Sequence, residues 1–102
     1  MLKAAQPAHE HQDVPPITSL IPQARRERGL TQRELADLLC EISHNDSVTR
    51  EEVSRWERGK RIPGPYWRTF LSAALDVPHA AVDRAALIER ETRRARTEDP
   101  SR

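Results

Sequence analysis

The segment VTREEVSRWERGKRIPG, residues 48–64, gathers side chains that form directed hydrogen bonds and ion pairs. A helix that begins after Thr49 and turns Val53 and Trp56 toward a core leaves the polar positions between them on its outer side. Arginine donates paired hydrogen bonds to guanine, and glutamate accepts one from the amino group of cytosine. We therefore predict contacts with the bases of double-stranded DNA from Arg50, Glu51, Ser54 and Arg55.

These outer residues also have simpler interpretations. Arg50 and Arg55 could lie on a solvated face or contact phosphate rather than bases. Glu51 could serve only to complement the positive end of the helix dipole. The mixed charge of the face nevertheless differs from that of a general phosphate binder, which favours the interpretation as a base-contacting surface.

Cations and helix ends around the same segment favour the binding of phosphate. Basic side chains on the loop that follows the helix are suited to hold a nucleic-acid backbone. Helix N-termini carry free N–H groups and a partial positive charge, and two such ends are expected near Gln32 and Thr49. The predicted phosphate contacts are Gln32, Arg33, Thr49, Arg58, Lys60 and Arg61.

Two similar segments, LTQREL at 30–35 and VTREEV at 48–53, predict the helices that position these residues. Each segment has a threonine N-cap followed three residues later by glutamate, which is the pattern of a capping box. Apolar residues on either side of each box can form a hydrophobic staple. The first helix should run to about Ile42, and the second should end at Gly59. Two short helices in succession indicate a helix-turn-helix unit.

Apolar residues at helical spacing predict three further helices, over Thr18–Arg28, Tyr66–Leu75 and Ala80–Arg96. No segment shows the alternation of a strand, so the predicted fold class is all-α. The sequence predicts a disordered arm over residues 1–16 and a DNA-binding domain over residues 17–78. A C-terminal helix over residues 79–97 and a disordered tail over residues 98–102 follow.

The composition limits the class of protein. The 102 residues are 36% hydrophobic and 32% charged, and the net charge of +1 excludes a uniform basic field. Fifteen arginines against two lysines favour forked hydrogen bonding to phosphate, guanine or carboxylate. The single Cys40 cannot form an internal disulfide, and neither a signal peptide nor a membrane-spanning run is evident. We therefore expect a cytoplasmic protein associated with the nucleoid.

In combination, LTQREL and VTREEVSRWERGKRIP resemble the Cro/phage-repressor helix-turn-helix family, also called the XRE group, over about residues 17–78. The resemblance implies a five-helix, repressor-like domain whose helix after Thr49 lies in the major groove, usually as a dimer on a palindromic operator. It also implies a partly buried, structural ion pair between Arg25 and Glu57.

The sequence departs from the family pattern at two places. The connection around CEISHND is longer than usual, which predicts one extra helical turn followed by a loose loop at 43–48. Arg68 occupies a position in the fourth helix that is usually apolar.

The leading hypothesis is a sequence-specific transcriptional regulator, with a homodimer that represses by occupying its operator. Few residues follow the last helix, so we expect no effector-sensing domain in this chain. The alternative is a protein-interaction module, such as an antitoxin or regulatory adaptor, that binds a protein partner through the C-terminal helix or the N-terminal arm. No carboxylate pair, triad or phosphate loop has a spacing that supports catalysis, so we expect neither an enzyme nor a cofactor.

Two other patterns have structural interpretations that we favour. Cys40 and His44 have the spacing of a metal-binding or nucleophilic pair, but two residues do not make a site, and we expect Cys40 in the core. The run ERETRRAR, residues 89–96, either touches DNA or forms ion pairs within a solvated helix, and the second interpretation is favoured.

Overall fold

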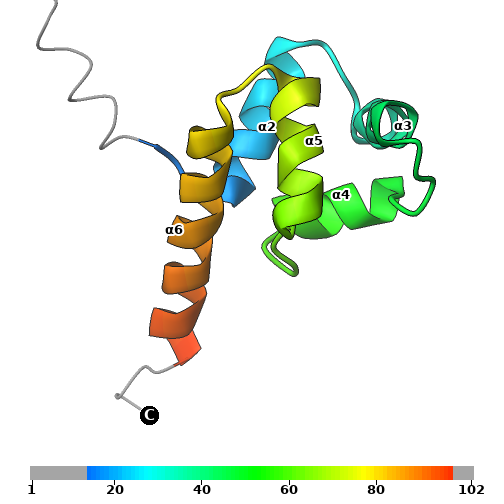
Figure 1. The fold of residues 1–102 in the computed structure, drawn as a ribbon. Coiled ribbons are helices and arrows are strands. Elements are labelled where there is room, and N and C mark those ends of the chain that lie inside the picture. Colours follow the sequence, from blue (N-terminus) through cyan, green and yellow to red (C-terminus); the bar gives the residue numbers. More distant parts are fainter. Residues whose placement is uncertain (1–13, 98–102) are drawn as a thin grey trace, which may run out of the picture.

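Five helices and no strand make up residues 14–97, the part of the chain that the computed structural model describes (Figure 1). The helices are α2 (Ile17–Glu27), α3 (Gln32–Ser43), α4 (Arg50–Glu57), α5 (Pro65–Leu75) and α6 (His79–Thr97). The all-α prediction is confirmed, and the expected helix boundaries agree closely with the observed ones. The predicted disordered segments, 1–16 and 98–102, lie outside the described residues except for positions 14–16.

Local sequence signals set the helix ends around α3 and α4. Thr31 Oγ1 accepts a hydrogen bond from Glu34 N (3.0 Å), and Glu34 Oε1 accepts one from Thr31 N (2.9 Å), so the first predicted capping box is present. Gly29 follows α2 with a φ of 70°, and Gly59 follows α4 with a φ of 74°. Both glycines adopt the left-handed conformation that ends a helix and that a Cβ would strain.

The hydrophobic core fixes the position of α4. This helix packs against α2 and α3, while α5 and α6 pack against each other and close the remaining sides. Trp56 of α4 is the largest fully buried side chain. Every helix contributes to the apolar set around it, which includes Ile17, Ile21, Leu35, Leu39, Val53, Leu71 and Val82. Because burial of this set stabilises one orientation of α4, the opposite side of that helix stays on the surface.

The connection between α3 and α4, residues 44–49, is held by hydrogen bonds and is not the loose loop that we expected. His44 ends α3 in the left-handed conformation, with a φ of 57°. Asn45 N donates to Cys40 O at 3.2 Å, and Cys40 Sγ donates to Val48 O at 3.2 Å. Val48 is buried, so the chain is anchored immediately before α4 begins.

Arg68, which stands at a usually apolar position of α5, joins α5 to α6 through polar contacts. Its Nε donates to Asp83 Oδ1 at 2.7 Å, and its Nη1 donates to Pro63 O at 3.0 Å. The guanidinium therefore satisfies a carbonyl of the α4–α5 loop and a carboxylate of α6 at the same time. An ion pair with Asp83 and a hydrogen bond to Pro63 O here take the place of the apolar contact of the family pattern.

α6 is the longest of the described helices, with 19 residues. In Figure 1 its N-terminal part lies against α2 and α5, and its C-terminal part continues past the loop that follows α4. No helix within residues 14–97 is both long enough and apolar enough to cross a membrane.

Candidate nucleic-acid interface

α4 has a buried side and an outward side. Val53 and Trp56 lie in the core, and Figure 1 shows the helix along the lower edge of the body. Ser54 is half-buried beside the outward residues. Those residues are Arg50, Glu51 and Arg55, whose side chains are 53%, 57% and 43% exposed. The structure thus brings the four predicted base-contacting residues to one surface.

The outermost two of these residues are only loosely paired. Arg50 Nη2 lies 4.0 Å from Glu51 Oε1, and both side chains are largely in solvent. An ion pair at that distance and exposure contributes little to stability. Both side chains can therefore turn toward a ligand at small energetic cost.

Glu52 organises the cations around α4, which the sequence interpretation missed. We predicted that its carboxylate would complete a capping box with Thr49, and that prediction is wrong. Thr49 Oγ1 does accept from Glu52 N, at a long 3.4 Å. The carboxylate instead accepts from Arg55 Nη1 at 3.1 Å and lies 3.7 Å from Arg61 Nε. Two guanidinium groups attract a carboxylate more strongly than one neutral backbone N–H, which explains the difference.

The i,i+3 spacing of Glu52 and Arg55 was a local signal that could have predicted their pairing. The contact with Arg61 had no such signal, because it depends on how the α4–α5 loop folds back. The consequence is that Glu52 holds one predicted base-contacting arginine and one predicted phosphate-contacting arginine close together.

Arg25 and Glu57 form the ion pair that the resemblance implied. Arg25 Nε lies 2.7 Å from Glu57 Oε2, and the two side chains are only 12% and 8% exposed. Arg25 Nη2 also donates to Glu57 Oε1, at 3.2 Å, and Gln32 Nε2 donates to the same oxygen at 2.8 Å. This network ties α2, the start of α3 and the end of α4 together.

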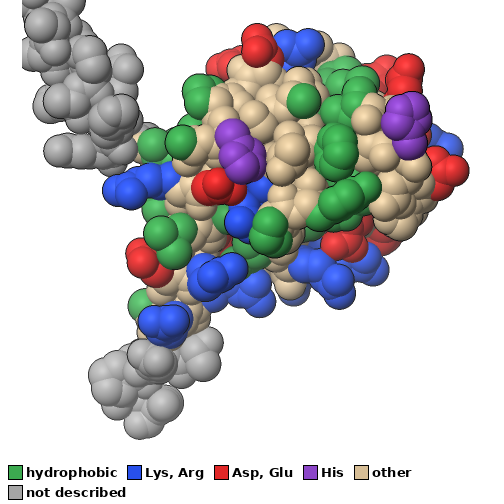
Figure 2. All heavy atoms as spheres, viewed as in Figure 1, with side chains coloured by type: hydrophobic (Ala, Val, Ile, Leu, Met, Phe, Trp, Pro, Cys, Tyr) green, Lys and Arg blue, Asp and Glu red, His purple; other side chains and the backbone are tan. Residues whose placement is uncertain are grey.

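The predicted phosphate contacts are distributed around α4. Gln32 is half-buried, and its amide is oriented by Glu57. The remaining members are all exposed: Arg33, Thr49, Arg58, Lys60 and Arg61. Figure 2 shows Lys and Arg side chains gathered along the lower edge of the molecule, beneath α4 and beside the lower part of α6. The chain is nearly neutral as a whole, and on the face that Figure 2 shows several of its Lys and Arg side chains lie along this edge.

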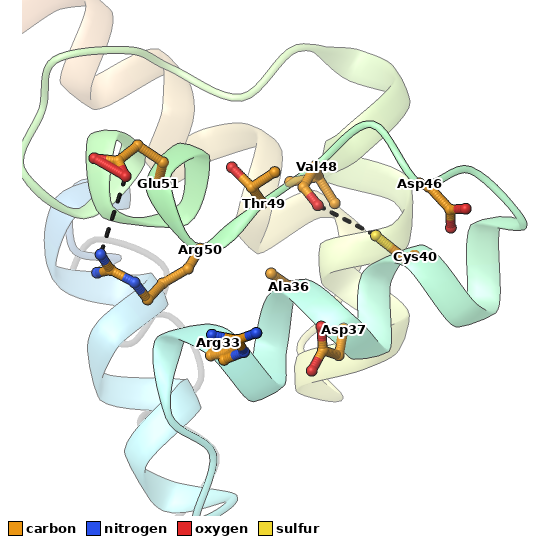
Figure 3. Close-up of a pocket in the computed structure, with 9 residues that line it drawn as sticks. All are labelled: Arg33, Ala36, Asp37, Cys40, Asp46, Val48, Thr49, Arg50 and Glu51. Carbon is orange, nitrogen blue, oxygen red and sulfur yellow. Dashed lines mark hydrogen bonds and ion pairs between the residues drawn. The ribbon is translucent and has the colours of Figure 1, made fainter.

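A groove of about 510 Å³ separates α3 from the N-terminal end of α4 (Figure 3). Arg33 and Arg50 supply its cations, and Asp37 and Asp46 supply carboxylates. The other lining residues are Ala36, Cys40, Val48, Thr49 and Glu51. A phosphate would be attracted by the arginines and repelled by the two aspartates, so the mixed lining limits where a nucleic-acid backbone can lie.

Cys40 and His44 lie in different surroundings at the end of α3. Cys40 is half-buried and donates to a backbone carbonyl, whereas His44 is exposed at the end of α3. Within residues 14–97, no three His, Cys, Asp or Glu side chains are arranged to hold a metal ion.

Comparison with known proteins identifies the central part of this fold. Residues 23–66, which run from within α2 to the start of α5, match the family model described as Helix-turn-helix. No curated protein and no solved structure matches the chain. This segment is therefore a helix-turn-helix of the XRE/Cro-like kind, which indicates a DNA-binding transcription regulator. The resemblance drawn from LTQREL and VTREEVSRWERGKRIP is confirmed.

Proposed function

We propose that the protein is a sequence-specific repressor that binds its operator as a homodimer. The observation that carries the proposal is the geometry of α4. Its apolar side is buried, while Arg50, Glu51 and Arg55 are exposed beside the cationic α4–α5 loop. An exposed helix of this kind fits the major groove, where base edges present distinct patterns of donors and acceptors.

In this proposal the outward residues of α4 read the bases. Arg50 and Arg55 donate to guanine O6 and N7, Glu51 accepts from cytosine N4, and Ser54 contacts a base edge beside them. The hydrogen bond from Arg55 to Glu52 supports this role, because it restricts the guanidinium to fewer orientations before binding.

In the proposal, the residues at the N-termini of α3 and α4 and on the α4–α5 loop contact the phosphates of the DNA backbone. Arg33 and Thr49 lie at the N-terminal ends of α3 and α4, and Gln32 presents a positioned amide there. Arg58, Lys60 and Arg61 extend the positive surface past the end of α4. Contacts with phosphate set the orientation of α4 in the groove without reading the sequence themselves.

Dimerisation and repression are further parts of the proposal. A chain with one reading helix covers one half-site, and a two-fold dimer covers two half-sites of a palindrome about one helical turn apart. Occupation of a site that overlaps a promoter then excludes polymerase from the DNA. Such a regulator would act in the cytoplasm, at the nucleoid.

Selection of bound duplexes from a random pool, followed by titration at several salt concentrations, tests the proposal. A recovered palindrome and an affinity that falls steeply with salt are the expected results.

Arg50→Ala and Arg55→Ala should each relax the preference at one base pair, at a cost of about 1–3 kcal/mol on the selected duplex. Lys60→Ala should weaken binding to selected and random duplexes alike. Equal losses on both duplexes for all three variants would refute the assigned roles, and indifference to any duplex would favour a protein-interaction module.

A further inference from the structure

The C-terminal end of α6 extends beyond the body of the fold next to the α4–α5 loop. Glu89 is its last buried residue, with 4% of its surface exposed. From Arg90 to Arg96 every side chain except the half-buried Arg93 is exposed. At 1.5 Å per residue these positions continue the helix for roughly two turns, or about 10 Å. Figure 1 shows this part of α6 continuing past the loop.

Glu89 marks the point where α6 leaves the body, and this point touches the loop. A Cβ placed on Gly59 would lie 3.2 Å from Glu89 Oε2, so the helix and the loop are in close contact there. Gly59 stands between two of the proposed phosphate contacts, Arg58 and Lys60. The projecting turns of α6 therefore begin beside the cationic loop.

Two arginines lie on the side of α6 that faces the body, in the turns that extend past Glu89. Positions four and seven residues after Glu89 lie on the same side of the helix, and they are occupied by Arg93 and Arg96. Contact between Arg96 Nη2 and Glu89 Oε2, at 3.7 Å, agrees with this placement. The Arg96 side chain is 65% exposed, so this pairing is weak and leaves the guanidinium accessible to a stronger acceptor.

We propose that the last two turns of α6 are a second phosphate-binding element, in which Arg93 and Arg96 hold the duplex beside the backbone held by the α4–α5 loop. Figure 2 supports this, since the positive side chains beneath α4 and those beside the lower part of α6 lie on the same edge of the molecule. This inference rests on the proposed function and enlarges its surface. It also replaces the solvated-helix interpretation that spacing alone favoured for residues 89–96.

A competing explanation is that these arginines only complement the negative C-terminal end of the α6 dipole. Two double variants distinguish these explanations, because each removes two arginines from α6 but from opposite sides of the helix. Arg93→Gln/Arg96→Gln changes the side that faces the loop, and Arg84→Gln/Arg94→Gln changes the opposite side. Glutamine has nearly the helix propensity of arginine, so both variants should fold, which circular dichroism will verify.

The measured quantity is affinity for the selected duplex and for a random duplex across a range of salt. Each phosphate contact contributes about 0.9 to the slope of log affinity against log salt, so Arg93→Gln/Arg96→Gln should lower its magnitude by about 1.8. The affinity ratio of the unaltered chain to this variant should then grow about twelvefold when salt falls from about 200 to about 50 mM. The loss should be equal on both duplexes, because phosphate contacts carry no sequence information. Arg84→Gln/Arg94→Gln should change the slope much less.

Hydroxyl-radical footprinting gives a second readout. The sugars that lose protection in Arg93→Gln/Arg96→Gln should neighbour those that lose protection in Lys60→Ala. If the unaltered chain binds DNA and both double variants keep its slope, or lower it equally, the α6 element is refuted while the proposed function stands. If the unaltered chain binds no duplex, both proposals fail.

Discussion

The network around Glu57 provides a direct test of how the fold holds α4. Glu57→Ala removes a carboxylate that accepts from Arg25 Nε (2.7 Å), Arg25 Nη2 (3.2 Å) and Gln32 Nε2 (2.8 Å). The Arg25 side chain is 12% exposed, so the substitution leaves a mostly buried guanidinium without its counter-charge. Removing one partner of a buried pair costs about 3–5 kcal/mol. We expect the lower end, about 3 kcal/mol, because Arg25 Nη1 keeps its bond to Leu30 O (2.9 Å).

Thermal unfolding followed by circular dichroism measures this loss. In a domain of this size each kcal/mol corresponds to about 4–8 °C, so Tm should fall by about 12–24 °C. Glu51→Ala removes an exposed glutamate from the same helix and serves as the control, with little expected change.

A double-mutant cycle isolates the pairing of Arg25 with Glu57. The double variant Arg25→Met/Glu57→Met should lose less stability than the sum of its single variants, because it leaves no charge buried alone. An unchanged Tm for Glu57→Ala, or strictly additive losses in the cycle, would show that the ion pair does not hold α4 in place.

Two other predictions concern stability. Gly59→Ala should lower the free energy of unfolding more than Gly29→Ala does. Both glycines have a positive φ (74° and 70°), a conformation that costs alanine about 1–2 kcal/mol. Only at Gly59 would the new Cβ also press on Glu89, at 3.2 Å, so equal losses of Tm would contradict the packing described for this loop. Arg68→Ala should lower stability by about 1–3 kcal/mol, because two acceptors lose a charged donor. Asp83→Ala should also lower stability, because it leaves the Arg68 guanidinium, in a side chain that is only 15% exposed, without its counter-charge. Unchanged stability of either variant in chemical denaturation would contradict this reasoning.

Local signals predicted the helices because helix ends depend on a few neighbouring residues. Thr31 and Glu34 form their capping box within one turn, and Gly29 ends α2 through its own backbone conformation. The outward side of α4 was predictable for the same reason, since burial of Val53 and Trp56 determines which residues of one helix remain exposed.

Contacts between distant segments were not predictable in this way. The pairing of Arg68 with Asp83 depends on how α5 meets α6, and no spacing within either helix reports it. Glu52 shows how a local pattern fails, because Arg55 and Arg61 compete for the carboxylate that a capping box would have used. The Arg25–Glu57 pair was anticipated only through the family resemblance, which carries three-dimensional information that one sequence lacks.

In the hydrogen-bonded connection between α3 and α4, the residues at the tip are independent of those that fix the orientation of α4. The turn is closed by the hydrogen bonds of Asn45 N to Cys40 O and of Cys40 Sγ to Val48 O. The position of α4 is set by buried side chains, the first of which is Val48. Residues at the tip, such as Asp46 on the rim of the groove, can therefore be exchanged or multiplied without tilting the helix behind them. The tip is accordingly a site where peptides could be inserted while the outward side of α4 keeps its position.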